Sequence, residues 1–131
     1  MKTGKEVIIP PGMIPPPEQH EIEAAWILTQ HYNCTVQFLK PSIGYKVKTA
    51  DFVMLGVLWE LKSPTSDSYR RCVSKRLDRA GTQSRSIVFD GRRTSLTDEF
   101  LHKELIKELA KRSSIERLIF ITKNSEVIAL K

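Results

Sequence analysis

The chain has 131 residues and a mass of 15.0 kDa; 40% of its residues are hydrophobic and 27% are charged. These values are typical of one globular domain that is long enough to bury a core. The sequence shows no apolar run of the roughly 20 residues that span a bilayer and no signal peptide. Its two cysteines are too few for a disulfide framework or a zinc site, which fits a domain that works in a reducing cytoplasm.

The charge is strongly basic. A formal net charge of +6 at pH 7 and a sequence pI ≈ 9.5 favour a polyanionic partner such as a nucleic acid. Charge that serves solubility alone is the alternative.

The first segment, residues 1–17, holds two proline-rich runs at 8–11 and 14–17. Proline excludes a helix here and favours extended or polyproline-like chain. We expect residues 1–17 to be an N-terminal arm or linker and residues 18–131 to form the domain.

A helix is predicted to begin near Pro17 or Glu18 and to end before Asn33. Acidic residues in its first turn suit the helix dipole. Its apolar stripe at helical spacing comprises Ile22, Ala24, Ala25, Trp26, Ile27, Leu28 and Thr29.

A strand at 34–39 and a basic loop at 40–48 follow. The loop contains Tyr45 among Lys40, Lys46 and Lys48, and this mixture of an aromatic ring and cations is one way to bind nucleic acid. A tyrosine that covers the edge of the core is the alternative. Lys48 is a candidate nucleic-acid-binding residue.

Two short apolar runs flank Gly56 and predict a tight β-hairpin over 51–62. With Leu55-Gly56 as the turn, Met54 pairs with Val57, and Asp51 stands opposite Glu60. Because side chains alternate along a strand, the hairpin has two faces. One is wholly apolar, comprising Phe52, Met54, Val57, Trp59 and Leu61. The other is apolar near the turn and carries Asp51, Glu60 and Lys62 at its open end.

Like charges directly opposed on a hairpin destabilise it, and a divalent cation between Asp51 and Glu60 removes that cost. Carboxylate oxygens suit hard ions such as Mg²⁺, with Mn²⁺ or Zn²⁺ as other possibilities. Lys62 lies on the same face, where an ammonium can stabilise developing negative charge. A polar strand end with a Glu60–Lys62 ion pair is the alternative.

Pro64 stops the strand, and a helix is predicted from about Ser68 to Gln83. Arg71, Lys75 and Arg79 are spaced by four and therefore line one face of this helix. They are candidate phosphate-binding residues; a solvated helix face is the alternative. The expected core positions of this helix are Cys72, Val73, Leu77 and Ala80.

In the last third of the chain, the sequence predicts a buried strand at 87–90 and a basic turn at 91–93. A helix at 98–111, capped by Ser95 or Thr97, and a hairpin over 117–130 are predicted to follow. The apolar positions expected in that helix are Phe100, Leu101, Leu105, Ile106 and Leu109. The order of elements predicts an α/β fold, in which helices flank a mixed central sheet.

Asp51 and the run Glu60-Leu-Lys-Ser-Pro64 resemble the core of the PD-(D/E)XK nuclease superfamily, whose fold is restriction-endonuclease-like. The whole series of elements is similar to the tRNA-cleaving toxin domain of contact-dependent growth inhibition systems, with an early helical Glu (Glu21), a late helical Gln (Gln83) and a strand that ends in Asp90. The resemblance implies that Asp51, Glu60, Lys62, Glu21 and Gln83 are catalytic and that Asp51 and Glu60 bind the metal.

The resulting expectation is a metal-dependent endonuclease that cleaves RNA, with tRNA favoured over DNA. A DNA endonuclease of the restriction or repair type and an inactive nucleic-acid-binding module are the alternatives. The resemblance also implies a cognate acidic immunity protein, delivery as part of a larger secreted protein and action in the cytoplasm.

Overall fold

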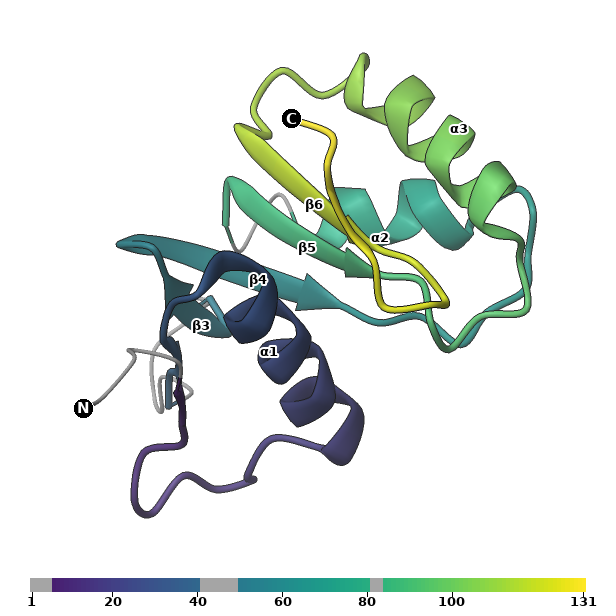
Figure 1. Ribbon diagram of the computed structural model, residues 1–131. Helices are drawn as coiled ribbons and strands as arrows, with labels where there is room; N and C mark the ends of the chain where they lie inside the picture. The colour runs from purple at the N-terminus through teal and green to yellow at the C-terminus, as the bar shows by residue number, and fades with distance from the viewer. Residues whose placement is uncertain (1–5, 41–49, 81–83) are drawn as a thin grey trace.

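The computed structural model describes residues 6–40, 50–80 and 84–131, which form a curled mixed sheet with helices on both faces (Figure 1). Within these ranges the strands are β1 (Val7–Ile8), β2 (Val36–Phe38), β3 (Phe52–Met54), β4 (Val57–Lys62), β5 (Ser86–Asp90), β6 (Arg117–Ile121) and β7 (Val127–Ala129). The helices are α1 (Gln19–Tyr32), α2 (Cys72–Ala80) and α3 (Asp98–Leu109). The α/β fold with a mixed, helix-flanked sheet is confirmed.

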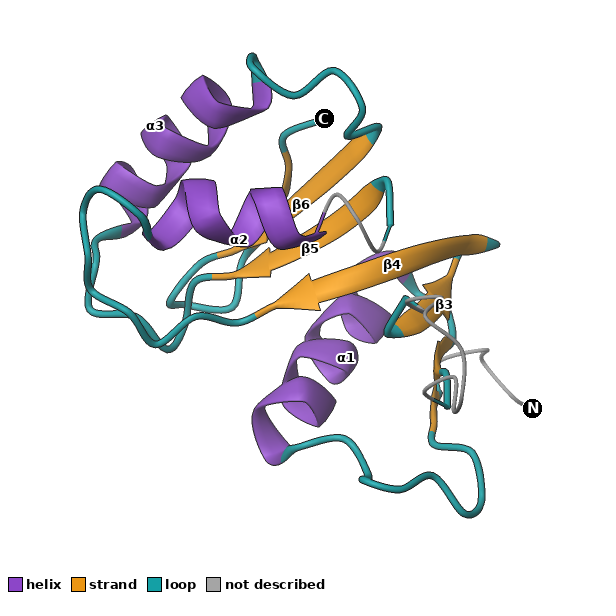
Figure 2. Cartoon of the chain, turned by 180° about the vertical axis from the view of Figure 1, so that it is seen from behind, coloured by secondary structure: helices purple, strands orange, loops and turns teal. Residues whose placement is uncertain are grey.

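The strands lie in the sheet in chain order, from β1 at one edge to β7 at the other. The central strands β4, β5 and β6 are parallel, and α2 and α3 are the crossovers that connect them. The hairpins β3–β4 and β6–β7 are antiparallel. Because parallel strands end at the same edge of a sheet, the carboxyl ends of β4 and β5 lie side by side (Figure 2).

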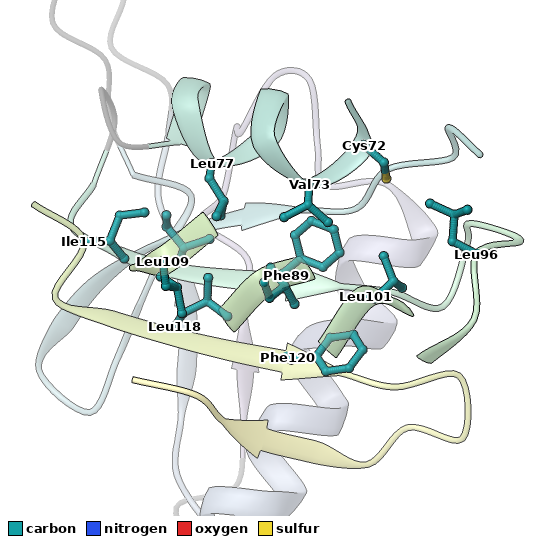
Figure 3. Packing of buried hydrophobic residues seen from close by; sticks show 12 residues of the cluster. Cys72, Val73, Leu77, Phe89, Leu96, Leu101, Leu109, Ile115, Leu118 and Phe120 are labelled. Atoms are coloured by element: carbon teal, nitrogen blue, oxygen red, sulfur yellow. The ribbon is translucent and has the colours of Figure 1, made fainter. Parts of the chain in front are cut away.

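Each face of the sheet has its own hydrophobic core, as expected for a sheet buried on both sides. Helices α2 and α3 cover one face, where their apolar side chains pack on Phe89 of β5 and Phe120 of β6 (Figure 3). Helix α1 covers the opposite face and packs on β2, β3 and β4 through Ala24, Ala25 and Leu28. No helix in the described ranges combines the length and the apolarity that crossing a membrane requires.

The predicted register of the first hairpin is confirmed, with Phe52 opposite Trp59 and Met54 opposite Val57. Leu55 and Gly56 both have positive φ angles, 56° and 72°, which is the geometry of a two-residue type I′ turn. The second face of the hairpin is apolar near the turn but is not buried there, since Leu58 is 54% exposed. Helix α2 packs farther along, toward β5 and β6, so within the described residues its core does not extend to Leu58.

Helix α1 begins after Glu18 and ends before Asn33, as predicted, and Asn33 is in the left-handed conformation that often follows a helix. Trp26 does not belong to the buried stripe, because it is 43% exposed. Two alanines lie at the helix–sheet contact and leave the larger ring on the flank. In the same way Ile106 of α3 is 49% exposed, while Leu101, Leu105 and Leu109 are buried.

The proline-rich segment contributes a strand that the sequence did not reveal. Val7 and Ile8 of β1 pair in parallel with Val36 and Gln37 of β2. Helix α2 begins at Cys72, four residues later than predicted. The intervening residues form a turn in which the amide of Cys72 donates to the carbonyl of Ser68. Cys72, Val73 and Leu77 are buried as expected.

Candidate active site

Asp51 and Glu60 face each other at the open end of the first hairpin. Asp51 directly precedes β3, one residue beyond the pair of Phe52 and Trp59, and lies close enough to Glu60 of β4 for its charge to act on that carboxyl. Its amide donates to the carbonyl of Trp59 (2.9 Å), and its Oδ2 accepts from the amide of Leu61 (2.7 Å). Both backbone and side chain of Asp51 are therefore fixed to β4.

Glu60 is a buried carboxyl with an incomplete set of partners. The residue is 2% exposed, and its Oε2 lies 3.1 Å from Nζ of Lys62. Within the described part of the chain no donor hydrogen-bonds its Oε1. Buried polar atoms are nearly always satisfied, so this oxygen marks a position where a cation or a proton is needed.

The pKa values of both carboxyls respond to this environment. Burial and the neighbouring Asp51 raise the pKa of Glu60 to about 7, against the opposing effect of the Lys62 ammonium. Burial also raises the pKa of Asp51, although the amide of Leu61 and the charge of Lys62 act in the other direction. Two close carboxyls that resist simultaneous ionisation form a site for positive charge.

The residues present fit a hard divalent cation. In the described ranges no group of three or more His, Cys, Asp and Glu side chains is arranged around one point. Asp51 and Glu60 thus offer two carboxylates, which suits Mg²⁺ because that ion keeps several waters and binds substrate phosphate. Zn²⁺ takes three or four protein ligands in its usual sites and fits less well.

Glu21 lies near Asp51 but has a structural partner. Its Oε1 accepts from the amide of Glu18 (2.7 Å), which is half of a capping box at the start of α1. Both Glu21 and Asp51 line a pocket of about 210 Å³. The other lining residues are Met13, Pro15, Pro16, Pro17, Glu18 and Phe38. The catalytic role of Glu21 stays a prediction.

The predicted basic row is exposed. Lys75 and Arg79 lie on α2, and Arg71 lies in the turn directly before it. All three side chains reach solvent, so nucleic-acid binding by this row stays a prediction. Gln83 and Lys48 lie outside the described residues.

A buried ion pair beside the site was not anticipated from the sequence. Asp90, at the end of β5, is fully buried and accepts from Nε (2.9 Å) and Nη2 (2.8 Å) of Arg92. Ser63, the residue after Lys62, also donates to Asp90 (3.2 Å). This hydrogen bonding to Asp90 raises the pKa of Arg92. The only local feature of the sequence that indicates this ion pair is an aspartate at the end of a buried strand, two residues before an arginine.

The same arginine holds helix α1 in place. Nη2 of Arg92 donates to the carbonyl of His20 (3.0 Å), and Nη1 lies 3.4 Å from the carboxylate of Glu23. The next residue, Arg93, contacts Nε2 of His20 (2.8 Å) and the carbonyl of Ser63 (3.4 Å). The side chain of His20 is 20% exposed and lies in this cluster.

Comparison with known proteins agrees with this architecture. The family model described as "Contact-dependent growth inhibition CdiA C-terminal domain" matches residues 48–127, a range that runs from β3 into β7 and includes Asp51, Glu60 and Lys62. No curated protein matches the chain. Among solved structures, the chain is similar to one from a CdiA-CT/CdiI toxin and immunity complex of Burkholderia pseudomallei. The similarity has a TM-score of 0.59 at 16% identity, and it covers 96% of this chain and 98% of the other. At that identity it is a likeness of fold.

Proposed function

Because the chain belongs to the contact-dependent growth inhibition CdiA C-terminal domain family, we propose that it is a toxin domain with metal-dependent nuclease activity. Its substrate is RNA, with tRNA as the preferred form. The sheet and the Asp51–Glu60–Lys62 arrangement form a PD-(D/E)XK nuclease core. The family match supports the toxin role, and the nuclease chemistry rests on the site itself.

The observation that carries the proposal is the environment of Glu60. A carboxyl that is 2% exposed, lies beside a second carboxyl and leaves Oε1 without a described donor is costly unless it binds a cation or a proton. A structural ion pair with Lys62 satisfies only Oε2. A divalent ion held by Asp51 and Glu60 satisfies the remaining acceptors of the pair.

In this proposal the metal ion, Asp51 and Lys62 each have a separate role in catalysis. Mg²⁺, when bound, supplies a water of lowered pKa and neutralises charge on the scissile phosphate. Asp51 is held by the amide of Leu61, so its carboxylate needs little reorganisation to act as a ligand. Lys62, whose side chain is 19% exposed, orients the attacking water and stabilises the negative charge that develops on the phosphate oxygens.

Substrate binding is assigned to the basic face. Arg71, Lys75 and Arg79 contact backbone phosphates and position the strand without reading its bases. The net charge of +6 adds long-range attraction for RNA. Glu21 borders the same pocket as Asp51 and is retained as a secondary active-site residue.

A cognate inhibitor completes the proposed function. The Burkholderia pseudomallei structure is described as a complex of a toxin with an immunity protein. By analogy, this chain has an acidic immunity protein that presents carboxylates to Lys62 and to the basic row, where charge complementarity speeds association. The domain is delivered as part of a larger secreted protein and acts in the cytoplasm.

Expression in a bacterial host tests the toxin role and the site together. Wild-type protein without an inhibitor should arrest growth and fragment tRNA, whereas Asp51→Ala at equal soluble expression should do neither. The matched control is Glu116→Ala, an exposed carboxylate just before β6 and outside the site, which should remain toxic. Normal growth with folded wild-type protein and intact tRNA would contradict the proposal.

A further inference from the structure

Tyr69 presents an aromatic ring to solvent in the loop between β4 and α2. It is 67% exposed, more than Trp26 on α1 at 43%. The ring packs on Phe100 of α3, with centroids 4.9 Å apart and ring planes at 84°. Phe100 is itself half-buried against the core of α2 and α3. Tyr69 is therefore held in position by the core while most of its surface stays open.

The surroundings of this ring are basic. Arg70 and Arg71 follow it directly, both are exposed, and Arg71 begins the row that continues with Lys75. Asp67 is the acidic residue that precedes it in the same loop, so cations dominate the segment. An exposed aromatic ring beside arginines is the combination that binds unpaired nucleotides, because the ring stacks on a base while the cations hold the backbone.

The loop that carries Tyr69 starts at the candidate active site. Residues 63–71 leave the carboxyl end of β4 directly after Lys62, and residues 91–97 leave the adjacent carboxyl end of β5. The two loops are joined, because Oγ1 of Thr94 donates to the carbonyl of Ser66 (2.6 Å). Ligands of α/β sheets bind at this edge, so one bound strand can reach Lys62 at one end and Tyr69 at the other.

We propose that Tyr69 is a stacking platform for an unpaired nucleobase, which makes a single-stranded segment of RNA the form that the domain binds. This inference deepens the proposed function and rests on it for the direction of the strand toward Lys62. A base inside a duplex has its faces covered by its neighbours and cannot stack on Tyr69. Single-stranded loops and ends expose those faces, as in most sequence-selective RNA recognition.

Binding can be measured apart from cleavage in an Asp51→Asn background. The probes are a short fluorescein-labelled single-stranded RNA and the same RNA annealed to its complement, followed by anisotropy. In that background Tyr69→Ala should weaken binding of the single strand roughly 5- to 100-fold. It should leave duplex binding and the salt dependence unchanged, because no charge is lost.

Two further variants serve as controls. Tyr69→Phe keeps the ring and should bind the single strand as the parent does. Trp26→Ala removes an exposed aromatic ring on α1 and should also leave binding unchanged. Thermal unfolding of each variant establishes that the protein is folded before its affinity is compared.

Several results would overturn the platform. They are unchanged single-strand affinity in Tyr69→Ala, an equal loss for the duplex, or an effect of Tyr69→Ala confined to binding of the inhibitor protein. The measurements distinguish failure of the stacking platform from failure of the proposed nuclease activity. Wild-type protein that cleaves RNA while Tyr69→Ala binds normally contradicts the platform alone. Protein that cleaves no nucleic acid but shows the expected Tyr69 dependence contradicts the nuclease alone.

Discussion

Nζ of Lys62 lies 3.1 Å from Oε2 of Glu60, and the carboxyl side chain in this pair is 3% exposed. The ammonium neutralises one side of Glu60 while Asp51 faces the residue across the hairpin. This arrangement leaves Glu60 with a pKa of about 7, so below neutral pH the metal-free site holds a proton that a divalent ion must displace.

The first prediction concerns pH and stability. Below about pH 4.5 Glu60 is protonated in both the folded and the unfolded protein; between 4.5 and about 7 only the folded protein keeps the proton. In EDTA the free energy of unfolding should therefore fall as pH rises through this window, by about 3 kcal/mol. Urea denaturation at a series of pH values measures this.

Glu60→Gln should remove most of that pH dependence and should stabilise the metal-free protein at pH 8. Glu116→Gln, at a side chain that is 49% exposed, is the matched control and should behave as wild type. Identical pH profiles for wild type and Glu60→Gln would show that Glu60 titrates normally.

The second prediction concerns the buried ion pair of Asp90 and Arg92. Arg92→Ala leaves a fully buried carboxylate without its main partner and should lower the free energy of unfolding by about 3 kcal/mol. Arg85→Ala breaks the exposed pair with Glu116 and should cost less than about 0.5 kcal/mol. Equal costs in urea denaturation would mean that the Asp90 cluster does not hold the edge of the sheet together.

The third prediction concerns the basic row. Replacing Arg71, Lys75 and Arg79 with Gln should weaken RNA binding and lower the slope of log affinity against log salt by roughly 2–3 units. The matched control replaces Lys103, Lys107 and Lys111, which are also spaced by four, along α3 and just beyond its end. It removes the same charge and should change the slope less. Equal slopes in the two triple variants would refute a specific role for the row.

The fourth prediction separates two roles of Glu21. Gln at this position can still accept the amide of Glu18, so Glu21→Gln should unfold at the temperature of wild type. If Glu21 also acts at the active site, the same variant should lose cleavage activity because the charge is gone. Full activity in Glu21→Gln would restrict Glu21 to the helix cap.

The parts of the fold that sequence reasoning predicted are those encoded locally. The first hairpin follows from alternation around Leu55-Gly56, and counting outward from this turn is enough to indicate that Asp51 lies near Glu60. The ends of α1 follow from Glu18 and Asn33 in the same way.

The missed features depend on contacts between distant segments. Arg92 joins β5 to the start of α1, a separation of 72 residues between Arg92 and His20, and no periodic pattern signals such a contact. The strand β1 is two residues long among prolines, so its composition suggested an unpaired arm. The exposure of Trp26 was set by how close the alanines bring α1 to the sheet.

Cleavage of purified total tRNA by the purified domain, with and without Mg²⁺, tests the central claim most directly. Wild-type protein should cleave tRNA in Mg²⁺ and lose this activity in EDTA. Asp51→Ala, Glu60→Gln and Lys62→Ala should each be folded and inactive, and plasmid DNA should remain intact. Cleavage of plasmid in place of tRNA would favour a DNA endonuclease, whereas tRNA left intact by folded wild-type protein in Mg²⁺, or full activity in any of the three variants, would contradict the account.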